Sequence, residues 1–157
     1  MNANRRPVFL RFSEEITAYS SLDLEGTGMV DTYQALLEGA LGSTLLPSFY
    51  ALASAVTSPG DPVQRKDVMR TKVLPSPIFW PVMSNLISLW YLGNWTMLPD
   101  SWYAATGLKK PAPGEPGFGG VPSPQAYIEQ LSYRTAGAHT PGAKPTGYGS
   151  WSIPPVF

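Results

Sequence analysis

The chain has 157 residues, with 11 Lys or Arg and 11 Asp or Glu, and charged residues make up only 14% of it. This length favours one domain with a modest core, and the zero net charge gives no basic surface for nucleic acid. The low charge favours a permanent partner, because free monomers usually carry more charged residues for solubility. The absence of cysteine excludes disulfides, iron–sulfur ligation and thiol nucleophiles. A single histidine, His139, argues against a transition-metal centre.

The N-terminus carries an arginine pair, Arg5-Arg6, followed by Phe9-Leu10, as in a twin-arginine export signal. A working signal needs an uninterrupted apolar stretch and a small-residue cleavage site, and Arg11 breaks this stretch. The sequence therefore predicts a short polar arm that leads into a first helix over residues 7–20. The apolar stripe of this helix has helical spacing and consists of Phe9, Phe12, Ile16 and Tyr19.

Two further helices are predicted over residues 27–40 and 43–56. Gly39 and Gly42 separate them, because glycine is a poor helix former. Pro47 falls near the start of the second helix, where proline is tolerated. Residues 20–26 are predicted as a turn with capping residues, and residues 63–74 as a weaker helix with a solvated cationic face.

The stretch 73–99 contains no charged side chain, and apolar residues cover most of the helix predicted over 77–91. Such a helix lies either at the centre of a bundle or in lipid. A transmembrane helix needs about 20 mostly apolar residues, whereas polar residues such as Asn85 interrupt this one and Gly93 ends it. The pattern favours a buried central helix. The alternative is a small membrane-associated protein anchored by residues 77–98.

The C-terminal third, residues 107–157, holds more than half of the 17 prolines and of the 15 glycines. It also carries several aromatic residues, which linkers seldom contain. One helix is predicted within it, with Ser123 as N-cap and Pro124 at the first helical position. Residues 136–157 show no regular period and are predicted to form an extended, aromatic-rich tail that lies against a partner.

No alternating strand pattern of useful length is present. The sequence therefore predicts an all-α fold, a small bundle of four or five helices with a long irregular C-terminal tail rich in Pro, Gly and aromatic residues. Residues 1–106 would form the helical core, and residues 107–157 an extended loop, a short helix and a partner-binding tail within one domain overall.

The sequence offers little catalytic chemistry. The glycine-rich segment 114–120 lacks a preceding strand and a Gly-Lys-Ser/Thr sequence, so it indicates a turn rather than a nucleotide site. The carboxylates Asp23, Glu25 and Asp31 are explained by capping and by the helix dipole. His139 has no nucleophile placed beside it by a motif, and Ser150 lacks the glycine spacing and strand of a nucleophile elbow. These patterns indicate a protein without catalysis of its own.

Three segments carry a resemblance to a known family. They are Phe9–Thr17 followed by Leu22-Asp23, the run Leu89–Trp95, and the C-terminal segments Ala126–Glu129, Gly137–Lys144 and Gly147–Trp151. In this order and spacing they resemble the small (gamma) subunit of bacterial membrane-bound, FAD-dependent sugar and polyol dehydrogenases, the sorbitol, fructose and glucose dehydrogenase complexes. The resemblance covers nearly the whole chain, although each segment is short.

The resemblance implies a subunit that binds no cofactor, remains bound to a large GMC-type flavoprotein, and is required for the folding and export of that flavoprotein. FAD would lie in the large subunit, and a multihaem cytochrome c would be a third subunit where the complex has one. The implied location is the periplasm, at the inner membrane only through the complex. Members of the family commonly have a twin-arginine signal, whereas this sequence starts almost directly at the first helix. Either the signal was removed, or export depends on a signal carried by a partner, or the complex is cytoplasmic, which is the alternative location.

The residues predicted to bind the partner are aromatic, because buried aromatic side chains dominate interface energetics. Tyr148 and Trp151 are the predicted anchors of the tail. The full set adds a histidine, two tryptophans and the C-terminal residue, giving Trp90, Trp95, His139, Tyr148, Trp151 and Phe157.

Overall fold

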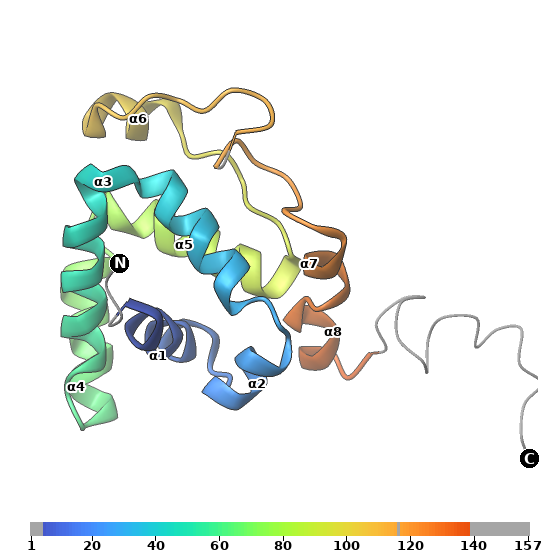
Figure 1. The fold of residues 1–157 in the computed structure, drawn as a ribbon. Helices are drawn as coiled ribbons and strands as arrows, with labels where there is room; N and C mark the ends of the chain where they lie inside the picture. The colour runs from blue at the N-terminus through green and yellow to red at the C-terminus, as the bar shows by residue number, and fades with distance from the viewer. Residues whose placement is uncertain (1–4, 116, 139–157) are drawn as a thin grey trace, which may run out of the picture.

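The computed structural model describes residues 5–115 and 117–138, and these residues form an all-α fold (Figure 1). The helices are α1 (Arg5–Thr17), α2 (Ser21–Gly26), α3 (Val30–Thr57), α4 (Pro62–Val68), the π-helix η1 (Met69–Val73), α5 (Phe79–Leu92), α6 (Asp100–Thr106), α7 (Pro124–Ile128) and α8 (Leu131–Thr135). Within the described part, β pairing is limited to one bridge, between Trp95 and Gly120. The all-α prediction is confirmed.

The described residues contain more helices than the four or five predicted, because several are very short. α2, α6 and α8 have six, seven and five residues. α2 replaces the predicted turn, and Ser20 caps it, with its hydroxyl accepting from the backbone N–H of Asp23. The predicted cap of α7 is present, since the Ser123 hydroxyl accepts from the N–H of Ala126.

α3 is bent at Gly42, where the backbone leaves helical geometry (φ 58°, ψ −178°). Only glycine adopts such a conformation readily, because it has no Cβ. The bend divides α3 into the two helices that the sequence predicts. Pro47 lies five residues after the bend, near the start of the second half, where few intrahelical bonds are lost.

The core forms where α1 lies in the angle between the two halves of α3, with α5 packed against both (Figure 1). Phe9 and Phe12 of α1 are completely or almost completely buried. The Phe12 ring meets Phe49 of α3 edge-on at 5.5 Å, and the Phe9 ring lies 6.5 Å from Trp90 of α5. The helical spacing of the apolar residues in α1 therefore produces the contacts that hold three helices together.

Two residues from the region after residue 107 also belong to this core. Ala126 of α7 and Leu131 of α8 are completely buried. Tyr19 is hydrogen-bonded to Thr135 through their hydroxyls, 3.0 Å apart, and this contact joins the region after α1 to α8. α7 and α8 thus close the side of the bundle near α2 and the end of α5 (Figure 1).

α5 has 14 residues, which corresponds to about 21 Å of helix. This length is shorter than the roughly 30 Å apolar thickness of a bilayer, and six α5 residues, including Leu86 and Leu89, are buried in the core. By length and composition, α3 is the helix among the described residues that is apolar enough to cross a membrane, with 33% of its most apolar window buried.

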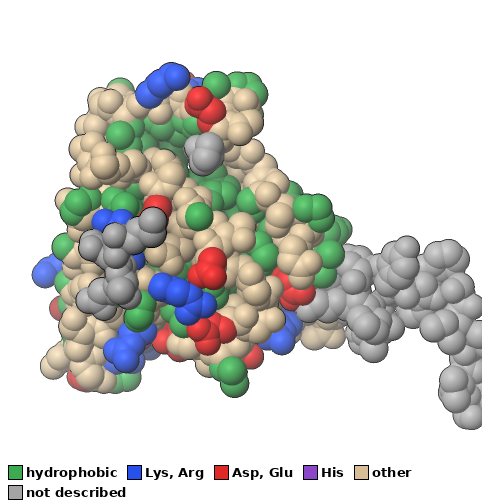
Figure 2. Space-filling view, in the orientation of Figure 1, with side chains coloured by type: hydrophobic (Ala, Val, Ile, Leu, Met, Phe, Trp, Pro, Cys, Tyr) green, Lys and Arg blue, Asp and Glu red, His purple; other side chains and the backbone are tan. Residues whose placement is uncertain are grey.

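Charged side chains of both signs lie side by side over α1 and α2 (Figure 2). Arg6 donates to Glu25 at 2.9 Å and to Asp31 at 2.8 Å. These pairs are exposed, so each contributes little to stability.

Candidate binding site

Trp90 is a core residue. Its side chain is 1% exposed, and its indole Nε1–H donates to the hydroxyl of Ser13 at 3.1 Å. The ring packs edge-on against Tyr33 of α3, with centroids 4.7 Å apart. The prediction that Trp90 contacts a partner is corrected by this position, since the side chain offers no surface to another protein.

Polar groups near Trp90 hold α1 against α5. The Tyr91 hydroxyl donates to the backbone carbonyl of Thr17 at 2.7 Å, and the Thr17 hydroxyl donates to the carbonyl of Ser13. Burial raises the pKa of Tyr91 above its ordinary value. The sequence did not indicate these bonds, because Ser13 and Thr17 looked like ordinary polar residues on a helix.

Trp95 follows Gly93, which ends α5 in the left-handed conformation (φ 62°). Backbone bonds in both directions pair Trp95 with Gly120, at 3.0 and 2.7 Å. The Trp95 side chain is also 1% exposed, so, like Trp90, it offers almost no free surface to a partner. The Nε1–H of Trp95 is buried and, unlike the Nε1–H of Trp90, has no hydrogen-bond partner.

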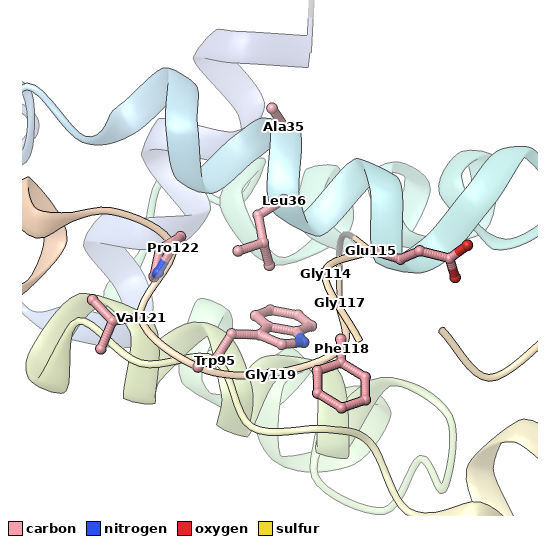
Figure 3. A pocket seen from close by; sticks show the side chains of 11 residues that line it. Ala35, Leu36, Trp95, Gly114, Glu115, Gly117, Phe118, Gly119, Val121 and Pro122 are labelled. Carbon is pink, nitrogen blue, oxygen red and sulfur yellow. The ribbon is translucent and has the colours of Figure 1, made fainter. Parts of the chain in front are cut away.

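A cavity of about 380 Å³ lies beside the Trp95 indole, between the first half of α3 and the loop 114–122. Figure 3 shows Leu36 of α3 pointing toward the indole, and the indole nitrogen facing the Gly117–Phe118 side of the loop. Val121 and Pro122 line the same cavity. Its walls are therefore largely apolar apart from the loop backbone and Glu115.

The described residues of the segment 114–120 form turns and bends, as predicted. Glu115 closes it by accepting from the backbone N–H of Ala112 at 2.7 Å through its carboxylate, while its carbonyl accepts from Phe118 N–H at 3.1 Å. Gly117 lies against α3, where an added Cβ would come within 3.2 Å of the Cβ of Ala40. The described lining residues include no Lys, Arg or His to bind a phosphate.

Three exposed apolar residues lie near the C-terminal end of α5. Leu92 is 55% exposed, Val121 50% and Tyr127 47%. The fold brings them to the same end, because Gly93 lies directly against the backbone of Ala126 and Tyr127, and Gly120 is paired with Trp95. We call Leu92, Val121 and Tyr127 the α5-end surface. Sequence periodicity alone could not place these three residues together.

The other predicted partner-binding residues, His139, Tyr148, Trp151 and Phe157, lie outside the described residues. Among the residues that the structure describes, no group of three or more His, Cys, Asp or Glu is arranged to hold a metal ion.

Comparisons of the chain with protein-family models, with curated proteins and with solved structures give no match.

Proposed function

We propose that this chain is a non-catalytic accessory subunit of a flavin-dependent sugar or polyol dehydrogenase complex. It stabilises a GMC-type catalytic subunit and assists the export of that subunit. FAD is bound by the catalytic subunit, and a multihaem cytochrome c, where present, carries haem and passes electrons onward. The proposal rests on the sequence resemblance of three segments to the small subunits of such complexes.

One structural observation supports this proposal most directly. The described stretches 9–17, 89–95 and 126–129, which carry part of the resemblance, are far apart in the chain but pack against one another. Ser13, in the first segment, accepts from Trp90 in the second. Gly93, also in the second, lies against Ala126, the first residue of the third. A resemblance spread over three segments is more informative when they form one packed unit than when they are separate surface stretches.

The α5-end surface is a second support. Exposed large apolar side chains that gather in one place typically mark a contact with another protein. Aromatic residues such as Tyr127 are enriched in such contacts. An accessory subunit needs a surface of this kind in addition to its own core.

Purification from the native host tests the proposal. The tagged chain is expected to retain a flavoprotein, identified by mass spectrometry, together with flavin absorbance and sugar-dependent dye reduction. Removal of residues 136–157 is expected to reduce the yield and the flavin content of the copurified protein. Unchanged yield, flavin and activity after truncation would refute the role of the tail, and the absence of any flavoprotein would refute the function itself.

The proposed location is the periplasm, at the inner membrane through the complex, with the cytoplasm as the alternative. Cell fractionation of the tagged chain distinguishes these locations. The membrane-anchor alternative for residues 77–98 predicts that the chain expressed alone partitions into detergent. The 14-residue length and the buried face of α5 favour the accessory role instead.

A further inference from the structure

The Trp95 Nε1–H is a buried hydrogen-bond donor without an acceptor. Such groups are rare in folded proteins, because the donor has lost its water and gained nothing in return. The Trp90 indole, five residues earlier, has an acceptor in Ser13. The Tyr33 hydroxyl in the helical core is also buried without a partner, but Tyr33 is not among the described residues that line the cavity beside Trp95. Trp95 lines that cavity, so an acceptor for its N–H can be supplied from there.

The cavity beside Trp95 is where such an acceptor would enter. The indole nitrogen faces the Gly117–Phe118 side of the loop (Figure 3), which covers it in this structure. The loop contains Gly114, Gly117, Gly119 and Gly120, all at positive φ. Glycine backbones move between conformations at little steric cost, so a shift of residues 117–118 is the movement that would expose the N–H to the cavity.

The cavity favours an uncharged, aliphatic occupant. Leu36, Val121 and Pro122 give it apolar walls. Its charged lining residue, Glu115, already accepts from the N–H of Ala112. A charged group would have no opposite charge among the described lining residues and would lose its hydration on entry. A backbone carbonyl beside an aliphatic side chain supplies both the acceptor and the apolar contact.

We propose that the Trp95 cavity binds an uncharged aliphatic segment of a partner polypeptide, with a backbone carbonyl of that segment accepting from Trp95 Nε1. Val121 lines the cavity and is itself 50% exposed, so a partner chain at the α5-end surface would reach the rim of the cavity at this residue. That the occupant is a protein segment rests on the proposed accessory function. The cavity itself is tested on the chain alone.

The test uses the full chain with nitrogen-15 in its tryptophan indoles, titrated with N-acetyl-leucine N-methylamide. The resonances are assigned with Trp95→Phe and Trp90→Phe. The Trp95 indole proton is expected to move downfield in a saturable manner, because a new hydrogen bond deshields it. The Trp90 proton, already bonded to Ser13, is expected to stay in place. No saturable change at Trp95, or equal changes at both indoles, would overturn the proposal.

Two variants locate the binding. Leu36 lines the cavity and points toward the indole (Figure 3), so Leu36→Trp is expected to fill the cavity and abolish the shift. Ala51, exposed on the second half of α3, gives the control Ala51→Trp, which is expected to bind as the unmodified chain does. The lysine analogue of the probe is expected not to bind. Equal binding by Leu36→Trp, with its fold verified by thermal melting, would refute this location.

The accessory function and the binding of a peptide in the Trp95 cavity can be refuted independently of each other. A saturable shift of Trp95 without a copurifying flavoprotein would refute the accessory function and leave the carbonyl-binding cavity supported. A copurifying flavoprotein without any shift of Trp95 would support the accessory function and refute the cavity as a peptide site.

Discussion

The two indoles of the run Leu89–Trp95 lie in contrasting surroundings. Trp90 sits among α1, α3 and α5, where its N–H donates to Ser13 and its ring meets Tyr33. Trp95 sits against the loop 114–122, where its N–H has no partner and a cavity lies beside it. Both side chains are equally buried. Burial alone therefore does not distinguish a residue that completes a core from one that borders a binding site.

The difference follows from what surrounds each residue. Regular helices bring Trp90 and Ser13 together, because both lie on faces that have to be buried. The wall around Trp95 is a glycine-rich turn. The carboxylate of Glu115 accepts from a backbone N–H of this turn, and Gly120 forms a backbone bridge with Trp95. Side-chain packing and the bond from Trp90 to Ser13 hold the helical interior, whereas the loop wall is held mainly by backbone bonds.

The largest expected effect is at Gly93, which joins the two regions. A Cβ there would lie 2.3 Å from the carbonyl oxygen of Ala126, and the residue has φ 62°. Gly93→Ala is expected to lower the free energy of unfolding by about 2–5 kcal/mol, combining left-handed strain with a backbone clash. Urea denaturation measures this change.

Gly107 provides the matched control for that experiment. It has φ 69° but nothing within 4 Å of an added Cβ. Gly107→Ala is expected to cost only the conformational strain, about 1–2 kcal/mol. If both substitutions cost the same, α7 does not pack against the end of α5 as described.

The next largest effect is the difference in the free energy of unfolding between Trp90→Phe and Trp95→Phe. Trp90→Phe removes a bonded N–H and leaves a gap in the core, so a loss of about 2–3 kcal/mol is expected. Trp95→Phe leaves a similar gap, but it also removes a buried donor that has no acceptor. Removing this donor is favourable and offsets part of the lost free energy of unfolding. The second variant is therefore expected to be more stable than the first by about 1–3 kcal/mol. Thermal or urea unfolding that ranks them in reverse would show that Trp95 has an acceptor.

Much of the helical region could be predicted from the sequence. The spacing of Phe9, Phe12 and Ile16 identified α1, and the two helices interrupted at Gly42 appear as the two halves of α3. Ser123 and Pro124 correctly marked the start of α7. These features are local, because periodicity, caps and helix-breaking residues act within a few positions of one another.

The candidate site could not be predicted in the same way. Trp90 and Trp95 were both assigned to a partner interface, because tryptophan is typical of interfaces and of cores alike. Only the distant residues Ser13 and Gly120 distinguish their surroundings, and no local pattern connects these to the tryptophans. α6 was missed as well, since its seven residues are too few to show a period.

Asn85 attaches the segment directly after Trp95 to α5. Asn85 is 5% exposed, its Nδ2 donates to the carbonyl of Thr96 at 2.6 Å, and its Oδ1 accepts from the backbone N–H and the hydroxyl of Thr96. Asn85→Ala is expected to cost about 0.5–1.5 kcal/mol, since the exposed Thr96 can turn to water. It is also expected to shift the Trp95 indole resonance and leave that of Trp90 unchanged. Equal shifts at both would mean that the two regions are not separable.

The smallest expected effect lies outside both regions, at Asp23 on α2. A hydrogen bond from Ser20, assisted by the charge of Arg134, lowers the pKa of this carboxyl below its ordinary 3.8. A group with a lowered pKa in the folded state adds stability that is complete above the unfolded pKa and is lost as the pH falls through the folded pKa. Asp23→Asn is therefore expected to flatten the pH dependence of the melting temperature only below about pH 4.

The Asp23 carboxyl is exposed, so the change in melting temperature should be small. Asp67→Asn, at an exposed surface ion pair with Arg70, is the control for general acid sensitivity. If Asp23→Asn instead altered stability near neutral pH, the carboxyl would have a structural role beyond its bond to Ser20, and α2 would belong with the helical interior rather than with the surface.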